Sequence, residues 1–296
     1  MLSKIEFKKR RNFGQVINDT FTFIRQNFKP LLKTYLIFCG LFVLGGMLSM
    51  ILQQYKTVHL FNNIDFANPA GKNDFSFSER FGLEYILAIL FSIAGYASTT
   101  VAILSYIAIY IQKGNQTPTT DELWGYFKHY FLKIFGSSIL LILLVCIGFL
   151  FCLVPGFWLF PFITMVFPIM VMENGSFSYS FSRSFKIIKD NFWLTFGILI
   201  VVWIIVYACM TLVVLPTTLV SMIGLFSTSK PQMSMIFTMF TTVLQYLCQA
   251  FTIIPVVTVA LVYFNLVEAK ENTGLMERIS NFGSTEKPID TRPEEY

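Results

Sequence analysis

The residues that most often carry chemistry in proteins are few in this sequence and lie far apart. There are two histidines, His59 and His129, and neither has a cysteine at metal-ligand spacing. Two histidines cannot supply a histidine-rich zinc or diiron site. The sequence contains no HExxH, GxSxG or phosphate-loop motif and no paired carboxylates. We therefore predict neither an enzyme nor a bound cofactor. The cysteines lie in apolar runs and are expected to be small buried hydrophobes: Cys39, Cys146, Cys152, Cys209 and Cys248.

Three polar residues within or beside apolar runs could take part in binding or catalysis. Glu173 could be a general acid or base, but a lone carboxylate at this position is more typical of a cap on the following helix. Gln245 and Gln249 lie one helical turn apart and could line a polar cavity or bind a substrate headgroup. Such amides more often hydrogen-bond to a neighbouring helix, which is the interpretation that we favour.

The composition of the chain shows which solvent must surround the elements that carry these residues. Of its 296 residues, 55% are hydrophobic, 17% are aromatic and only 13% are charged, and the mean hydropathy is +0.63. A soluble protein has about 25% charged residues, so this chain has too few to cover a surface in water. We expect most of the polypeptide to lie in lipid.

The apolar runs are long enough to predict membrane-spanning helices, each of which needs about 20 residues. Six candidates cover approximately residues 34–52, 85–111, 134–153, 157–172, 192–222 and 234–267. A turn at Pro155 and Gly156 separates the third from the fourth and predicts a helical hairpin. The last two are longer than a span needs, so we expect them to tilt, to kink at Pro216 and Pro255, or to begin outside the hydrocarbon.

The basic residues predict the orientation of these helices. With six spans, 18 of the 22 Lys and Arg residues fall on the side that holds both termini, and 4 fall on the other side. By the positive-inside rule, both termini are cytoplasmic, and we predict a multi-pass protein of the bacterial inner membrane. No span has an ionisable residue at its centre, which argues against a proton-coupled carrier or a voltage sensor.

A short amphipathic segment with basic residues precedes each of the three predicted hairpins. The segments share a pattern: an aromatic residue, two residues, an apolar residue, a base, two residues and another aromatic residue. We interpret this as an internal repeat over about 12–111, 119–172 and 177–267, although an aromatic-rich membrane protein can give such matches by chance. The predicted membrane-interface residues are Phe21, Arg25, Phe28, Trp124, Lys128, Phe131, Phe185, Lys189 and Phe192.

The sequence thus predicts an all-α polytopic membrane protein in which six transmembrane helices form three hairpins, each preceded by an amphipathic interfacial helix. Its basic segments are expected to meet anionic lipid headgroups, and a nucleic-acid-binding arm is the less favoured alternative. Residues 1–283 form one transmembrane domain that ends in a short surface helix containing Leu275 and Phe282, and 284–296 are a disordered cytoplasmic tail. Small residues around Ser98 are expected to pack helices of this chain together rather than a dimer.

Some of these residues resemble those of a known family. The residues concerned are Val154 to Trp158, the stretch from Pro168 to Glu173, and then Ser180, Arg183, Ser184, Lys189, Asn191, Phe192 and Trp193. They look like the core of a family of six-helix bacterial inner-membrane proteins related to the membrane domain fused to some glycerophosphodiester phosphodiesterases. The segment from Phe264 to Gly283 is similar to that of members found in Bacteroidota. The resemblance implies the six-helix fold but no catalytic residue, because the phosphodiesterase chemistry resides in a separate soluble domain.

From these features we predict a non-enzymatic, membrane-embedded accessory or scaffold protein that binds membrane or cytoplasmic partners. The alternative is a transporter or flippase-like handler of a lipid or apolar molecule, with Gln245 and Gln249 beside its pathway.

Overall fold

The fold is that of an all-α polytopic membrane protein, as predicted. The computed structural model describes residues 5–62, 82–151, 153–226, 235–272 and 276, and these contain no strand. The helices are α1 (Phe13–Gln26), α2 (Phe28–Asn62), α4 (Leu83–Gln112), α5 (Thr120–Phe151), α6 (Leu153–Met172), α7 (Phe177–Ile188), α8 (Phe192–Phe226), α9 (Met235–Cys248) and α10 (Ile253–Glu271). Short 3₁₀ turns, η1 (Lys189–Asn191) and η2 (Gln249–Thr252), join α7 to α8 and α9 to α10.

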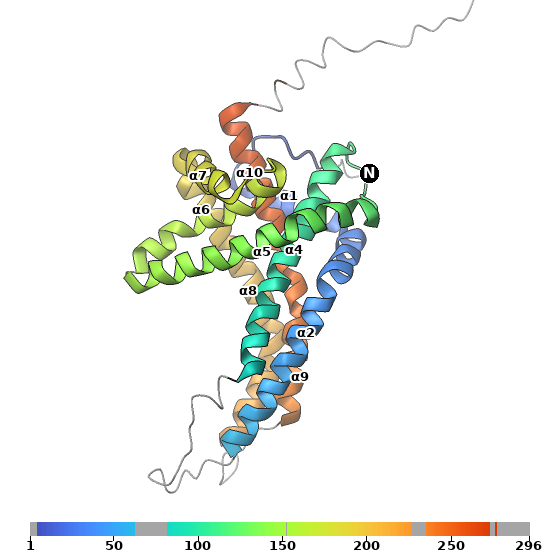
Figure 1. Ribbon diagram of the computed structural model, residues 1–296, viewed down its shortest axis with the longest axis vertical. Coiled ribbons are helices and arrows are strands. Elements are labelled where there is room, and N and C mark those ends of the chain that lie inside the picture. Colours follow the sequence, from blue (N-terminus) through green and yellow to red (C-terminus); the bar gives the residue numbers. More distant parts are fainter. Residues whose placement is uncertain (1–4, 63–81, 152, 227–234, 273–275, 277–296) are drawn as a thin grey trace, which may run out of the picture.

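The helices form a long bundle with a crosswise group at one end. Helices α2, α4, α8 and α9 run along the long axis, with α10 continuing from α9, and α1, α5, α6 and α7 gather where the chain begins and α10 ends (Figure 1). We call these four helices the tier. Within the described residues, five helical segments are long and apolar enough to cross a membrane, and Gly156–Met172 is a shorter apolar helix. Helices α5 and α6 run across the bundle axis and project to one side (Figure 1).

The contact between α2 and α4 confirms the predicted use of the small residues around Ser98. The Ser98 hydroxyl is fully buried and donates to the backbone carbonyl of Phe38 at 2.8 Å. Further along α2, a Cβ atom on Gly45 would lie 2.6 Å from the Phe91 ring of α4. The two backbones therefore approach closely within one chain, as small residues permit.

The predicted turn at Pro155 and Gly156 is wrong in its position. Both residues lie inside α6, which begins at Leu153, whereas α5 extends to Phe151. A proline in the first turn of a helix loses no hydrogen bond, because the amide groups there have no intrahelical partner. Gly156 lies where α6 meets α5: a Cβ on Gly148 of α5 would be 3.7 Å from its Cα, an ordinary van der Waals distance.

Two other expectations about helix continuity have different outcomes. The second amphipathic segment is not a separate helix, because α5 runs without a break from Thr120 to Phe151. The sixth span is broken where predicted: α9 ends at Cys248 and Pro255 lies in the first turn of α10, after η2. Pro255 cannot donate to a carbonyl four residues earlier, which favours the interruption. Pro216, in contrast, lies inside a continuous α8.

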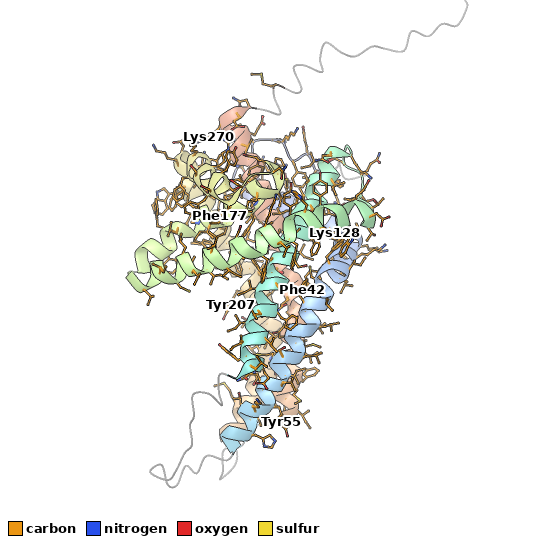
Figure 2. All side chains as sticks on the ribbon, viewed as in Figure 1. Phe42, Tyr55, Lys128, Phe177, Tyr207 and Lys270 are labelled. Carbon is orange, nitrogen blue, oxygen red and sulfur yellow. The ribbon has the colours of Figure 1, made fainter. Side chains whose placement is uncertain are left out.

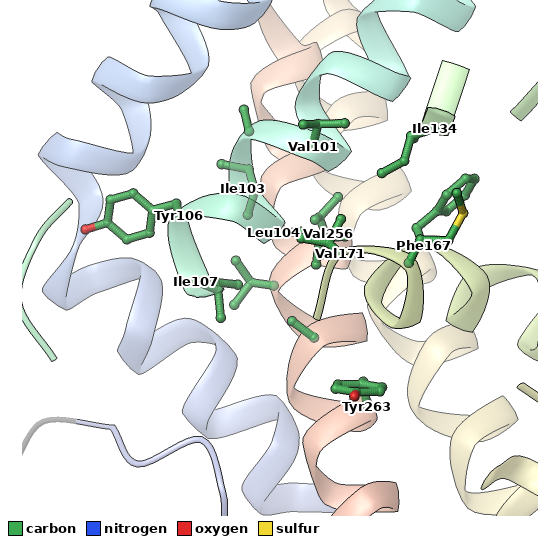
Figure 3. Close-up of a cluster of buried hydrophobic side chains, with 14 of the residues drawn as sticks. Val101, Ile103, Leu104, Tyr106, Ile107, Ile134, Phe167, Val171, Val256 and Tyr263 are labelled. Atoms are coloured by element: carbon green, nitrogen blue, oxygen red, sulfur yellow. The ribbon is translucent and has the colours of Figure 1, made fainter. Parts of the chain in front are cut away.

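The densest part of the core lies where α4 meets the tier and α10. Figure 3 shows side chains of this cluster, including Ile103 and Ile107 of α4, Ile134 of α5 and Tyr263 of α10. Most of the second half of α4 is buried, so α4 is the central helix around which the tier and α10 pack. The predicted surface helix near 275–283 and the tail from 284 to 296 lie outside the described residues, apart from Met276.

Candidate functional site

The segment before α1 fastens the tier to the bundle. Phe7 is 2% exposed, and its ring contacts Phe23 of α1, Tyr110 of α4 and Phe264 of α10 at centroid distances of 5.1, 6.4 and 5.6 Å. Phe7 thus ties three helices together. Edge-on aromatic contacts of this kind contribute stability beyond that from the burial of apolar area.

Arg11 adds a buried polar anchor to the same segment. Its guanidinium pairs with Asp19 at 2.7 Å and donates to the backbone carbonyls of Phe7 and Lys9. Its backbone N–H donates to the Asn265 side chain of α10 at 2.7 Å. A buried guanidinium is tolerated when its donors are satisfied, as these are. The segment is therefore held to α1 and to α10 by hydrogen bonds as well as by apolar packing.

Glu173 is the centre of a second polar contact between the tier and α10. Its carboxylate accepts hydrogen bonds from the Tyr179 hydroxyl of α7 at 2.7 Å and from the Tyr263 hydroxyl of α10 at 2.9 Å. Arg183 donates to Glu173 at 3.4 Å and pairs with Glu271 at the end of α10. The hydrogen bond to Glu173 raises the pKa of the Tyr179 phenol. The favoured prediction that Glu173 caps the next helix is wrong, because Ser176 is the cap of α7.

A polar hollow of about 600 Å³ opens on the tier between the end of α4, the start of α5 and the loop before α7. Lys113 and Glu122 form an ion pair at 2.6 Å at its wall, and the lysine holds the pKa of Glu122 down to about 2. The Tyr130 hydroxyl donates to Asn174 at 3.1 Å, which joins α5 to the loop. His129 also lines the hollow. The lining thus mixes both charge signs with tyrosine hydroxyls, which suits a surface for polar contacts.

The predicted interface residues of the first copy lie on the exposed side of α1 and the start of α2. Phe21, Arg25 and Phe28 are exposed, Phe28 to 57%. The buried face of α1 is a different one, which contains Val16 and Phe23. Helix α1 therefore has one apolar face against the protein and an aromatic face that remains open.

In the second copy the aromatic residues contact α2 instead. Trp124 lies 5.8 Å from Phe38, and Phe131 stacks on Phe42 at 5.3 Å, although Trp124 remains half exposed. Lys128 is exposed and its ammonium lies 5.2 Å from the centre of the Trp124 ring, a cation–π contact. Figure 2 shows Lys128 near the outer part of the tier.

In the third copy Phe185 and Phe192 pack against α6, and Lys189 between them is exposed. Phe185 stacks on Phe162 at 4.2 Å, and Phe192 lies 6.4 Å from Trp158. The base of the pattern is thus exposed in every copy, whereas the aromatic residues differ in their partners. The internal repeat stays a prediction.

The predicted polar cavity at Gln245 and Gln249 is not among the described cavities. Gln245 is exposed on α9 and Gln249 is half-buried in η2. Neither lines the polar hollow or either of the other described cavities, the smaller of which has about 30 Å³ and lies beside Pro255.

The largest described cavity is an apolar groove between the α5–α6 hairpin and α8, with a volume of about 800 Å³. Phe157, Phe160 and Ile163 of α6 form one wall, and α8 forms the other from Phe196 to Leu212. We call this the α6–α8 groove. No sequence pattern indicates this groove, because its lining residues belong to long apolar runs.

The cysteines take part in no described site. Cys39 and Cys248 are buried, as expected, but Cys146 is exposed and Cys209 is intermediate, because these two lie on the outer faces of α5 and α8. Cys152 lies outside the described residues. Across the part of the chain that the structure describes, no three histidine, cysteine or acidic side chains come together as metal ligands would.

Comparison of the chain with protein-family models, with curated proteins and with solved structures gives no match. The resemblance to the membrane domain of glycerophosphodiester phosphodiesterases therefore stays a prediction.

Proposed function

We propose that this integral membrane protein is a non-enzymatic accessory or scaffold that presents the tier, on the cytoplasmic face of the bacterial inner membrane, to a partner protein. The observation that carries the proposal is that the tier is braced to the bundle and carries the polar hollow. The braces are the Phe7 and Arg11 segment and the Glu173 network, both of which end on α10.

A braced surface favours binding because little conformational freedom is lost when a partner docks. The hollow offers Tyr126, Tyr130 and His129 beside the paired Lys113 and Glu122. Tyrosine is enriched at protein interfaces because its ring is apolar and its hydroxyl can hydrogen-bond. With Asp121 beside the ion pair, the lining has two carboxylates and one lysine, which suits a polar protein surface better than an anionic ligand.

Photo-crosslinking in intact membranes tests the proposal. Photoreactive benzoylphenylalanine is placed at Tyr126, in the hollow, and, as the control, at Tyr55, which is 45% exposed towards the opposite end of α2 (Figure 2). We expect a discrete and reproducible protein adduct from Tyr126 and none of the same mass from Tyr55. Failure to obtain such an adduct at Tyr126, or the same adducts from both positions, would contradict a scaffold role for the tier.

The proposed orientation has its own test. In a background without native cysteines, Lys186→Cys lies on α7 of the tier and Tyr55→Cys lies towards the far end of the bundle. A membrane-impermeant maleimide added to intact cells should label the cysteine at 55 and leave the one at 186 unlabelled, with the reverse in inside-out vesicles. The opposite labelling would place the tier outside the cell.

A further inference from the structure

The α6–α8 groove has the dimensions of a lipid-chain site. Its α8 wall runs from Phe196 to Leu212, which at 1.5 Å per residue is about 24 Å. One leaflet of the hydrocarbon core is about 15 Å deep, half of the whole. A groove of about 800 Å³ and this length can hold an extended acyl chain over its full depth in the leaflet.

The groove is open at the side, and its lining is apolar like the surrounding lipid chains. Tyr207 and Leu212 of α8 line it while more than two thirds exposed, and Phe157 on the α6 side is 58% exposed. Figure 2 shows Tyr207 on the bundle below the projecting hairpin. A chain can therefore enter from the bilayer without crossing a polar barrier. The α5–α6 hairpin of the tier lines one side of the groove and α8 lines the other, so a chain inside it contacts protein on two sides.

An exposed base and an interfacial aromatic residue lie at the tier end of the groove. Trp193 is 78% exposed one turn before Phe196 on α8, and Lys189 lies one turn before Trp193, at the start of η1. Lys189 is also flanked by Phe185 and Phe192, which pack on the α6 residues Trp158 and Phe162. Among the described residues, the Lys189 side chain forms no ion pair or hydrogen bond.

We propose that the α6–α8 groove binds one phospholipid, with an acyl chain between α6 and α8 and an anionic headgroup against Lys189. The apolar lining selects a hydrocarbon chain. Lys189 supplies the charge complementary to the headgroup phosphate, and Trp193 lies at the depth where tryptophan meets headgroups. The proposal goes beyond the scaffold role, because it assigns a ligand site that shares no lining residue with the polar hollow.

Native mass spectrometry of the whole, delipidated protein tests the assignment, with dioleoyl phosphatidylglycerol and dioleoyl phosphatidylcholine as probes. These lipids share their chains and differ in headgroup charge. We expect one saturable adduct, with phosphatidylglycerol favoured about fivefold, the effect of about one lysine near an anionic headgroup. Ala208→Trp places an indole in the groove at an exposed position and should lower the occupancy of both lipids about tenfold. Lys189→Gln should remove the preference and leave phosphatidylcholine binding unchanged.

Matched controls are available for both variants. Val213→Trp adds the same indole to α8 at a half-exposed position that does not line the groove. Lys128→Gln removes an exposed base from the tier on α5. Both should bind the two lipids as the wild type does. Many non-saturating adducts, an equal effect of Ala208→Trp and Val213→Trp, or a preference that survives Lys189→Gln would each overturn the proposal. So would a dimer that Ala208→Trp dissolves, because the occupant would then be a second copy of the chain.

The wild-type protein provides a measurement that does not depend on the folding of a variant. A phosphatidylglycerol with a diazirine on its acyl chain is photolysed with the protein in vesicles of phosphatidylcholine, and the adducts are mapped by peptide mass spectrometry. We expect adducts concentrated on 157–163 and 196–212. Adducts spread evenly over the outer faces of α2 and α9 would show ordinary bilayer contact and refute a specific site.

Discussion

Replacing Glu173 tests whether the tier is braced by chemistry rather than by packing alone. Glu173→Leu removes the acceptor of two tyrosine hydroxyls, and Tyr263, one of the donors, is only 4% exposed. A hydrogen bond to a charged group contributes about 1.5–3 kcal/mol to stability. A buried donor that is left without an acceptor also costs its desolvation free energy. The contact with Arg183 adds little, because it is 3.4 Å long and partly exposed. Because the bond from Tyr179 is exposed, most of the effect comes from Tyr263, and we expect a loss of about 3 kcal/mol in the free energy of unfolding. Glu173→Gln keeps a neutral partner for both hydroxyls and should lose about 1 kcal/mol.

The assay is thermal unfolding of the purified protein in detergent at a fixed heating rate. One kcal/mol corresponds to roughly 2–4 °C for a chain of this size, so Glu173→Leu should lower the melting temperature by about 10 °C. Asp121→Asn, the same loss of a carboxylate at an exposed position of α5, is the control and should remain within about 2 °C. If Glu173→Leu has the melting temperature of the wild type, or if Asp121→Asn lowers the melting temperature by a similar amount, the Glu173 contacts do not brace the tier.

Three further predictions use pairs of like substitutions or a pH series. Gly45→Ala should destabilise by about 1–3 kcal/mol, because its Cβ would lie 2.6 Å from a phenyl ring of α4, whereas Gly40→Ala, with nothing within 4 Å, should be neutral or stabilising in the same unfolding assay. Phe7→Ala should lower the free energy of unfolding by about 4 kcal/mol and speed trypsin cleavage at 8–11, because the anchored segment is released, whereas Phe13→Ala, at 38% exposure, should do neither. The pKa of Glu122 is about 2 in the folded protein and about 4.3 in the unfolded chain. Its ion pair therefore stabilises the fold fully above about pH 5, and this stabilisation is lost as the pH falls towards 2. The difference in melting temperature between the wild type and Glu122→Gln should shrink between pH 7 and pH 3.

The fold class was predictable because it depends on the length and composition of the apolar runs. In lipid, few structures are compatible with such runs. Apolar runs of about 20 residues predict helices, since a continuous helix satisfies all its backbone groups within lipid, whereas barrel strands are shorter and alternate in polarity. The position of each helix end is harder to predict. The pattern around Pro155 was assigned to a turn, yet proline begins a helix as readily as it follows one. The segment at 119–134 was expected to precede the span as an interfacial helix, but the two form the single helix α5, because no residue between them interrupts its hydrogen bonds.

The candidate sites were less predictable, because each depends on residues that are far apart in the sequence. Arg11 meets Asn265, and Glu173 meets Tyr263, across separations of 254 and 90 residues. Local patterns contain no signal for such pairs. The groove is hidden for another reason: an apolar side chain that faces a protein groove and one that faces lipid have the same composition. Gly148 and Gly156 were the available hint, because paired small residues predict close helix approach and so fix the hairpin that lines the groove.

The three predicted copies of the aromatic and basic pattern differ in the surroundings of their aromatic residues and agree in the exposure of their bases. The aromatic residues have different neighbours: exposed surroundings at Phe28, α2 at Phe131 and α6 at Phe192. The bases Arg25, Lys128 and Lys189 are all exposed. An aromatic ring can exchange lipid for protein with little change in free energy, since both are apolar, whereas a cation must keep contact with water or headgroups. If the pattern served only helix packing, the bases would have no common environment. Among the described cavities, the α6–α8 groove is the one that lies beside such a base, Lys189, and can hold a lipid chain.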